Sequence, residues 1–200
     1  MREFVVVGHE APTTPDFSLS ELPGAGRLDV LCRCVTSGLL LSHDIREAVR
    51  VRLVLGGEYV VQFDGAELRH LHPDERSAAS LIRGALEHRD GAVGAQAADA
   101  SPGVTIRRGG LADALEALPA SATVVALRAD GDALIDLEPP AHPAFVLSDH
   151  RSFTDADLAV LAEVADERVA VGPAAVHADH AVTVAHNYLD TDGYSRYRSR

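Results

Sequence analysis

The sequence contains no lysine and no tryptophan, and it has only two cysteines, one methionine and 4% aromatic residues. Two cysteines cannot form a disulfide scaffold of the kind that stabilises small secreted domains. On a helix, Cys32 and Cys34 would point about 200° apart, so they could neither bond to each other nor share a metal. We therefore expect both to be small buried hydrophobic residues and the core to be aliphatic.

Long hydrophobic runs are also missing. No apolar run approaches the ~18 residues that a membrane span needs. The first ten residues contain four consecutive apolar positions, 4–7, which is shorter than the apolar region of a signal peptide. We expect a cytoplasmic protein with no membrane segment. A chain of 200 residues, 46% of them hydrophobic, is long enough to bury one sizeable core.

The charge is strongly acidic: 18 arginines face 30 acidic residues, for a net charge of −12. The excess is −3 over residues 1–110 (12 Arg, 15 acids) and −9 over residues 111–200 (6 Arg, 15 acids). An acidic chain normally disfavours nucleic acid, because that affinity comes largely from neutralised phosphates. However, a lysine-free, Asp-rich composition suggests a high-GC genome and a salt-rich cytoplasm, where this argument weakens. Net charge alone does not decide the partner.

Hydrophobic periodicity predicts an α/β domain with a mostly parallel sheet flanked by helices. We find no repeat and no linker that would split it. Expected strands cover 2–7, 49–55, 59–63, 104–107, 122–127, 134–137, 144–147 and 169–171; expected helices cover 28–39, 75–86, 111–118, 154 onward and 177–189, with 90–103 as a surface loop and 129–131 as a turn. Thr154 and Asp157 form a capping-box signature at the start of one helix.

Several catalytic signatures are absent, including the P-loop and the Gly-x-Ser-x-Gly elbow. The segments Ser-His-Asp at 42–44 and Ser-Asp-His at 148–150 contain the residue types of a hydrolase triad. Adjacent side chains cannot form the line from nucleophile to base to orienting acid, so a hydrolase would need one residue from each segment to meet in space.

The histidines invite a metal hypothesis, most of all His177, His180 and His186 with Asp179. On one helix His186 would lie about 240° round from His180, so the three rings could not converge. We expect no metal site and interpret these histidines as caps and surface residues.

Three polar loops follow apolar strands, after Leu127, Leu147 and Val171. Sheets of this class bind ligands at the carboxyl ends of their strands. The last loop leads into a helix whose first amides are free donors. A mostly apolar crevice between the loops suits a nucleoside-containing cofactor, and ordinary turns are the alternative.

Several segments resemble the TrmY family of archaeal tRNA pseudouridine-54 N1-methyltransferases, in the correct order and over nearly the whole chain. The segments are 1–4 (MREF), 8–13 (GHEAPT), 26–35 (GRLDVLCRCV), 145–150 (FVLSDH), 171–180 (VGPAAVHADH) and 187–190 (NYLD). The resemblance implies a SPOUT-type fold with a C-terminal trefoil knot, a homodimer, and S-adenosylmethionine as methyl donor. It implies one methyltransferase domain, 1–200, with an RNA-facing first half at about 1–110 and a cofactor-binding knot at about 122–190.

Carried over by position, the resemblance assigns the cofactor contacts to Leu127, Ser148, Gly172 and Ala181. The family commonly has Gly at 148 and Cys at 181. Serine adds a side chain where the backbone approaches the ligand, and alanine removes a sulfur contact. We expect weaker cofactor binding at worst, because recognition through the backbone survives both changes.

Arg27, Asp29 and Arg33 match polar positions shared with the related ribosomal pseudouridine N1-methyltransferases. Asp29 and Arg33 are four apart on a helix, so a plain surface ion pair is one interpretation. The resemblance implies instead that Arg27 and Arg33 hold RNA phosphates and that Asp29 is catalytic. Asp29 would accept the N1 proton of pseudouridine or orient it for removal.

The function implied is methyl transfer to N1 of a pseudouridine in the tRNA T-arm. The alternatives are a ribosomal RNA pseudouridine N1-methyltransferase, a non-catalytic RNA-binding or assembly factor, and the hydrolase considered above.

Overall fold

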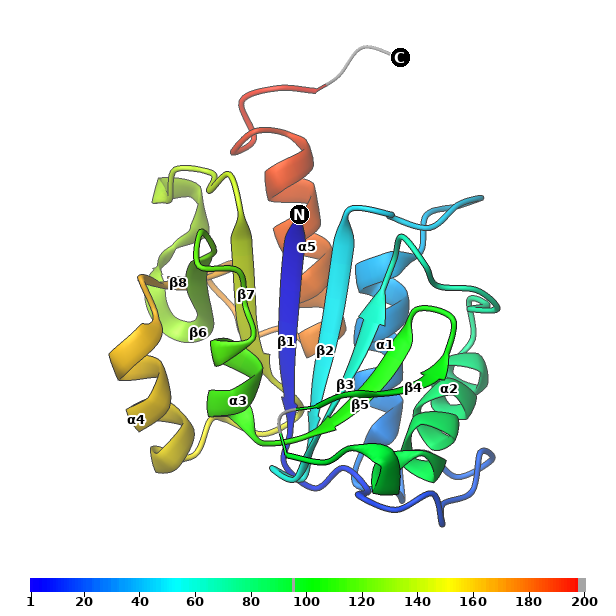
Figure 1. Cartoon of the computed structure of the whole chain (residues 1–200). Coiled ribbons are helices and arrows are strands. Elements are labelled where there is room, and N and C mark those ends of the chain that lie inside the picture. Colours follow the sequence, from blue (N-terminus) through cyan, green and yellow to red (C-terminus); the bar gives the residue numbers. More distant parts are fainter. Residues whose placement is uncertain (95, 198–200) are drawn as a thin grey trace.

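The computed structural model describes residues 1–94 and 96–197 and contains one eight-stranded sheet in the order β4-β5-β3-β2-β1-β7-β6-β8 (Figure 1). The strands are β1 (Arg2–Gly8), β2 (Val49–Leu55), β3 (Tyr59–Asp64), β4 (Ala98–Ser101), β5 (Val104–Arg108), β6 (Thr123–Ala133), β7 (Pro143–Ser148) and β8 (Glu167–Ala170). The helices are α1 (Leu28–Leu39), α2 (Glu75–Glu87), α3 (Leu111–Glu116), α4 (Asp155–Val164) and α5 (Ala178–Asp190).

Strand β1 lies at the centre of the sheet and runs parallel to both neighbours, β2 and β7. Strand β6 is parallel to β7 and to β8. Only β3, β5 and β4 at the other edge pair antiparallel. The prediction of an α/β domain with a mostly parallel, helix-flanked sheet is confirmed.

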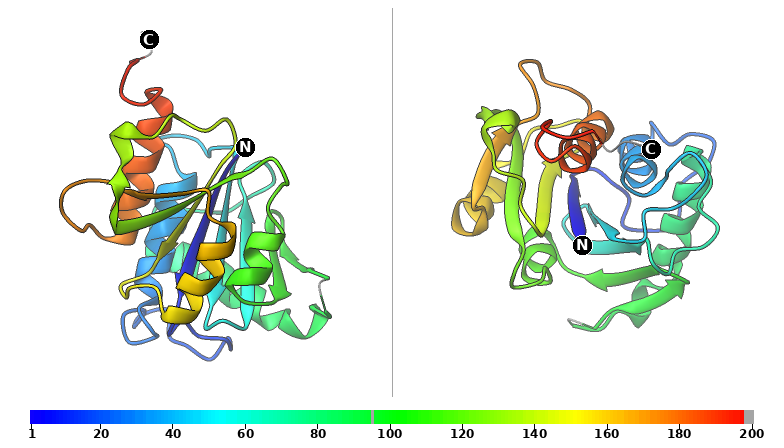
Figure 2. Two further views of the ribbon diagram at one scale, coloured as in Figure 1. Left: turned by 90° about the vertical axis from the view of Figure 1, so that its left-hand side faces the viewer. Right: turned by 90° about the horizontal axis from the view of Figure 1, so that it is seen from above.

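Helices cover both faces of this sheet. Helices α1, α2 and α5 lie on one face, and α3 and α4 on the other (Figure 2). The alternation within β1 shows why: Phe4 and Val6 point into the first core, whereas Val5 and Val7 point into the second. Cys32 and Cys34 are fully buried and unpaired, as predicted.

The predicted helix starts are confirmed by their caps. The Asp74 carboxylate accepts a hydrogen bond from the Ser77 amide (2.8 Å) and begins α2. At α4, the Thr154 hydroxyl accepts from the Asp157 amide and the Asp157 carboxylate accepts from the Thr154 amide, which completes the capping box.

Three predictions of strands and loops were wrong. The expected loop at 90–103 contains the edge strand β4, whose Ala-Asp-Ala-Ser sequence has little strand propensity and which forms by pairing with β5. The turn expected at 129–131 is a register shift within β6, which runs on to Ala133. Gly131 permits this, because a Cβ there would lie 2.6 Å from the Val169 backbone. Residues Leu134–Asp136 are therefore not a strand but a 3-10 turn.

His186 was also misplaced by the sequence interpretation. It is not a surface residue but is buried between α5 and α1, where its Nε2 donates to the Gly38 carbonyl at 2.9 Å.

Candidate functional site

A cavity of about 490 Å³ opens at the carboxyl ends of β6, β7 and β8. Each of the three segments predicted to form a crevice supplies part of its wall, and the first turn of α5 closes one side. The segments after Leu147 and Val171 are loops, as predicted, whereas the segment after Leu127 is a continuation of β6. All four residues predicted to contact a cofactor line this cavity, namely Leu127, Ser148, Gly172 and Ala181. The structure thus brings together side chains that are 54 positions apart in the sequence.

The cavity wall is mostly apolar and offers backbone groups. The Ser148 hydroxyl is buried and has no hydrogen-bond partner among the described residues. A buried polar group without a partner costs about 1–3 kcal/mol, so a ligand that accepts this hydrogen bond would be favoured. A Cβ added at Gly172 would meet nothing within 4 Å, which leaves the backbone of that loop open to the cavity.

Asp149, which lines the cavity, joins the end of β1 to the loop that follows β7. Its buried carboxylate accepts backbone hydrogen bonds from His9 (3.0 Å) and Arg151 (2.8 Å). The His9 ring lies between two carboxylates, with Nδ1 3.4 Å from Asp149 and Nε2 2.8 Å from Asp157. His9 therefore connects the cavity loop to the cap of α4.

The same contacts affect ionisation. Burial opposes the charge of Asp157, but hydrogen bonds from Thr154 and His9 outweigh it and hold the pKa of Asp157 below its usual value.

The outer rim of the cavity carries His150 and Arg151. The Arg151 guanidinium donates to Glu10 at 2.5 Å. The His150 ring lies between two carboxylates, with Nδ1 3.6 Å from Asp149 and Nε2 3.9 Å from Glu10. His150 lines the cavity and its side chain keeps 23% of its surface exposed, so a ligand can reach it.

Arg27, Asp29 and Arg33 form a second cluster at the start of α1. The Arg27 guanidinium donates to both oxygens of Asp29 (3.0 and 3.1 Å), and Arg33 donates to Asp29 Oδ2 at 2.9 Å. Asp29 is only 4% exposed. Burial opposes its charge, but the bonds from both arginines hold the pKa of Asp29 below its usual value.

The Asp29–Arg33 ion pair is thus present, but it is not a simple surface pair, because Asp29 is buried and also binds Arg27. Arg33 also donates to Glu75 at 2.9 Å and lies 3.5 Å from Asp179, so it connects α1, α2 and α5. Burial opposes its charge as well, but hydrogen bonds to Glu75 and Asp29 raise the pKa of Arg33.

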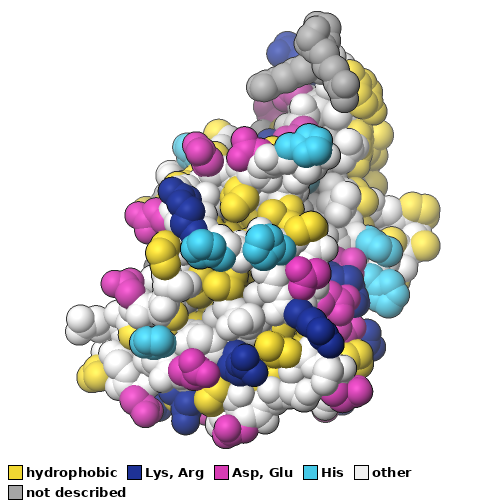
Figure 3. Space-filling model, turned by 90° about the vertical axis from the view of Figure 1, so that its right-hand side faces the viewer, with side chains coloured by type: hydrophobic (Ala, Val, Ile, Leu, Met, Phe, Trp, Pro, Cys, Tyr) yellow, Lys and Arg dark blue, Asp and Glu magenta, His cyan; other side chains and the backbone are white. Residues whose placement is uncertain are grey.

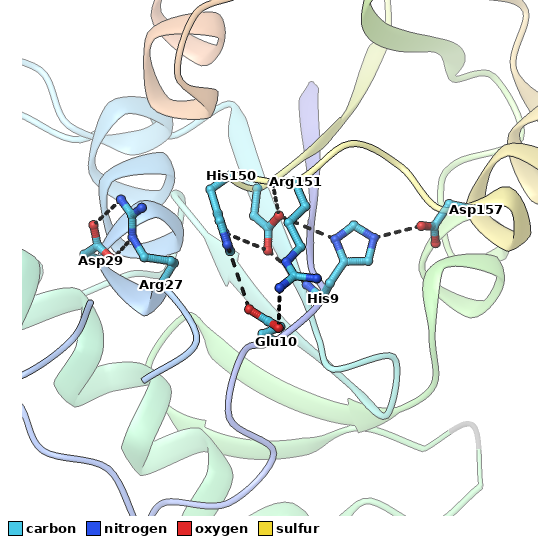
Figure 4. A network of polar contacts seen from close by, with 8 residues as sticks. His9, Glu10, Arg27, Asp29, His150, Arg151 and Asp157 are labelled. Atoms are coloured by element: carbon cyan, nitrogen blue, oxygen red, sulfur yellow. Dashed lines mark hydrogen bonds and ion pairs between the residues drawn. The ribbon is translucent and has the colours of Figure 1, made fainter. Parts of the chain in front are cut away.

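The two clusters lie close to each other, at the same end of the sheet. Asp29 raises the pKa of Arg27, and the Asp149 carboxylate adds to the effect across the gap between them. In Figure 4 the His150 ring projects from the Asp149 network on the side of Arg27 and Asp29.

The hydrolase alternative gains no support from this geometry. Within the described part of the chain, the Ser148 hydroxyl has no hydrogen bond to a histidine, so no nucleophile–base pair is formed. His43, in the other Ser-His-Asp segment, lies in the loop that enters the amino-terminal end of β2, away from the cavity. No group of three or more metal-ligating side chains occurs among residues 1–94 and 96–197.

Comparison with known proteins gives the family. The profile of the SAM-dependent RNA methyltransferases matches residues 1–194. The chain belongs to this family.

Relatives within the family are similar over almost their whole length. The chain is 63% identical to the tRNA (pseudouridine(54)-N(1))-methyltransferase of Haloferax volcanii, covering 98% of this chain and 100% of that protein. It is 59% identical to the protein of the same name from Natronomonas pharaonis, with the same coverage. Identity to the one from Methanosarcina acetivorans is 41%, over 95% of this chain and 91% of that protein.

Among solved structures, Nep1 of Archaeoglobus fulgidus, bound to S-adenosylhomocysteine, shares the fold of this methyltransferase with a TM-score of 0.66. The alignment covers 94% of this chain and 97% of that one at 16% identity. In the described part of the chain, no helix has the length and apolar character that crossing a membrane requires.

His9 is a residue of the cavity network whose contacts the sequence interpretation missed. Its partners lie 140 and 148 positions away, and no local pattern marks such a contact. The only available signal was its position directly after the central apolar strand.

Proposed function

We propose that this protein methylates N1 of pseudouridine 54 in the T-arm of tRNA, with S-adenosylmethionine as the donor. The observation that carries the proposal is the match to a tRNA (pseudouridine(54)-N(1))-methyltransferase at 63% identity over 98% of this chain and all of the other. The placement of the cavity at three strand ends supports it independently, because nucleoside cofactors bind there in α/β sheets.

Leu127, Ser148, Gly172 and Ala181 would hold the cofactor, which supplies a methyl group on a positively charged sulfur. A volume of about 490 Å³ is in the range of small-molecule sites. The unpartnered Ser148 hydroxyl would donate to an oxygen or nitrogen of the ligand, and the open backbone at Gly172 would accept and donate alongside it.

Asp29 would orient the target base. Its two oxygens are already held by Arg27 and Arg33 and its pKa is lowered, so it is a fixed negative charge facing an N–H donor. Arg27 and Arg33, whose side chains are 38% and 30% exposed, would also contact RNA phosphates.

Selection of pseudouridine would follow from its chemistry. Pseudouridine is attached through carbon, so N1 carries a proton and can be methylated, whereas N1 of uridine is bonded to the sugar. The reaction is an in-line displacement, whose main requirements are alignment of the two reactants and exclusion of water. A stacked base would have to turn out of the T-loop to enter the site.

The RNA would lie mainly on the first half of the chain, about residues 1–110. One side of this half shows arginines interspersed with acids rather than a continuous basic patch (Figure 3). Recognition of the shape of the tRNA arm would therefore outweigh attraction by charge, in keeping with a salt-rich cytoplasm.

The finer architecture belongs to the same proposal: a single SPOUT domain over residues 1–200, with a trefoil knot at about 122–190 that holds the cofactor, and a homodimer. The fold shared with Nep1 supports it. A symmetric dimer would bring a second first half beside each cavity.

The test is nucleoside mass spectrometry after incubation with S-adenosylmethionine in about 2–3 M KCl, which screens the acidic surface. Matched T-arm RNAs would carry pseudouridine or uridine at position 54, and a ribosomal RNA fragment with pseudouridine would be the third substrate. N1-methylpseudouridine from the T-arm pseudouridine RNA alone is the expected result. Product only from ribosomal RNA, or cofactor binding with no product, would contradict the proposal.

A further inference from the structure

His150 is the only histidine among the described residues that line the cavity. The reaction proposed above releases a proton from N1, and the mechanism must deliver that proton to some group. The inference below rests on that proposed function and names the group.

Asp29 is poorly suited to take the proton. Three guanidinium hydrogen bonds occupy its oxygens, and its pKa is lowered, so the ionised form is already stabilised. A carboxylate in this state is a weak base but a good acceptor of a hydrogen bond that is kept. The site therefore needs a second group that can bind a proton.

His9 is also unsuited, although it is nearby. Its ring nitrogens already lie 3.4 Å from Asp149 and 2.8 Å from Asp157, and its side chain is only 15% exposed. The ring is occupied in holding the cavity loop against α4.

His150 has the surroundings of a proton acceptor. Its Nδ1 lies 3.6 Å from the buried Asp149 carboxylate, which backbone amides fix in place. Its Nε2 lies 3.9 Å from Glu10, on the exposed side of the ring. The charged groups around it are Asp149 and Glu10; Glu10 also accepts from Arg151, and Arg27 lies within the electrostatic reach of Asp149. The two nearest are carboxylates, which would stabilise the imidazolium that forms.

We propose that His150 is the general base of the methyl transfer. The pseudouridine ring would enter between Arg27–Asp29 and the cavity rim, with its N1–H directed at Nε2 of His150; Figure 4 shows these side chains. As the bond from the methyl carbon to N1 forms, the carbon–sulfur bond breaks and its electron pair stays on sulfur. The N1 proton passes to Nε2, and Asp149 holds the ring through Nδ1.

The test compares the wild type with His150→Ala, His150→Gln and the control His43→Ala. His43 is exposed and lies in the loop at the opposite end of the sheet, so it offers the same chemical change away from the cavity. We expect kcat of both His150 variants to fall about 100-fold, with RNA KM and S-adenosylhomocysteine affinity within about threefold of the wild type. His43→Ala retains wild-type values.

Two readouts separate proton transfer from a structural role. Added imidazole restores part of the kcat of His150→Ala, because it supplies the missing base, and does not affect His43→Ala. The wild-type rate falls as the pH is lowered, since a protonated imidazole cannot accept another proton, and the His150→Gln rate lacks that fall.

A third readout does not depend on turnover. In spectra of ¹⁵N-histidine protein, the His150 signal, assigned by its absence from His150→Gln, shifts when T-arm pseudouridine RNA and S-adenosylhomocysteine are added.

The outcomes are distinct. If the wild type makes N1-methylpseudouridine but His150→Ala keeps its kcat, or loses only RNA or cofactor affinity, His150 is not the base while the proposed function stands. A His150 signal that RNA leaves unchanged also overturns the inference. If the wild type makes no product from any RNA, both the function and the role of His150 fall.

Discussion

The two ends of the sheet each contain a buried carboxylate held by two arginines, yet the two carboxylates differ in ionisation. At the amino-terminal end, Glu3 is paired with Arg52 and lies near Arg50. Its burial outweighs both arginines and raises its pKa. At the carboxyl-terminal end, the hydrogen bonds of Arg27 and Arg33 outweigh burial and lower the pKa of Asp29.

The space beside each carboxylate differs as well. The cavity at Glu3 measures about 180 Å³, whereas the one next to the Asp29 cluster measures about 490 Å³ and has an unpartnered hydroxyl in its wall. Residue types alone therefore do not identify a functional site in this fold. Position at the carboxyl ends of parallel strands, with room for a ligand, does so.

The largest expected effect is a loss of stability at the amino-terminal end. Replacing Arg52, which is 4% exposed, by Met leaves Glu3 buried beside a single, more distant arginine. We expect the free energy of unfolding to fall by about 3–5 kcal/mol, measured by denaturant titration. The double variant Glu3→Leu, Arg52→Met should recover most of this loss. If Arg52→Met instead abolished methylation in a fully folded protein, the assignment of stability to one end of the sheet and activity to the other would be wrong.

The second-largest expected effect is a pH dependence of the folding stability, which arises at the amino-terminal end of the sheet. His186 Nδ1 accepts from Arg2 at 3.1 Å while Nε2 donates to Gly38, so the neutral ring is fully bonded. Burial, reinforced by Arg46 and Arg2, lowers its pKa to about 4. The neutral form is favoured in the folded state, so its contribution to stability is full above the unfolded pKa of about 6.5 and is lost as the pH falls to about 4.

That contribution is roughly 3 kcal/mol, from the difference between the two pKa values. We expect the wild type to lose about this much more stability than His186→Gln between pH 6.5 and 4, measured by urea unfolding at each pH. Parallel pH curves for the two proteins would show that His186 is not the group responsible.

At the carboxyl-terminal end the effect should fall on activity. Asp29→Asn keeps the shape of the side chain but removes the charge that we propose to orient the substrate, so we expect kcat/KM to fall about 100-fold. The matched control is Asp64→Asn, which removes the carboxylate that Arg50 contacts at 2.6 Å at the other end. Its methylation rate should match the wild type. Equal losses of kcat/KM in the two variants would show that the two ends of the sheet do not differ in their effect on activity.

The smallest expected effect is at Ser148. Ser148→Ala removes an unpartnered hydroxyl, so the ligand-free protein should gain up to about 1 kcal/mol of stability. Affinity for S-adenosylhomocysteine should fall by about fivefold, because the variant lacks the hydroxyl that would donate a hydrogen bond to the ligand. Thermal unfolding with and without ligand measures both changes. Tighter binding by the alanine variant would show that the hydroxyl faces no ligand acceptor.

Much of this architecture could be predicted from the sequence because it is local. The β2–β3 hairpin, the Thr154 capping box and the loops that follow β7 and β8 can be read from residue types at short spacing. Strand β4 could not be predicted, since its residues favour no strand until β5 is present to pair with them. The continuation of β6 depends in the same way on β8.

At the site, resemblance and spacing gave the cavity-lining residues, but not how charges are distributed among the elements. An Asp29–Arg33 pair was one interpretation of the spacing, but no local pattern indicated that Glu75, 42 positions away, binds the same guanidinium. The same holds for His9 and its distant carboxylates. These contacts arise when helices pack, after local structure has been decided.

The central place of β1 has a consequence for how the chain folds. Strand β1 can pair with β2 once residue 55 has been made, but its other neighbour, β7, is completed only at residue 148. Pairing over such a sequence separation requires closure of a long loop and slows folding. The nascent chain thus carries a strand with one open edge through most of its synthesis, and the cavity can form only after that edge is filled.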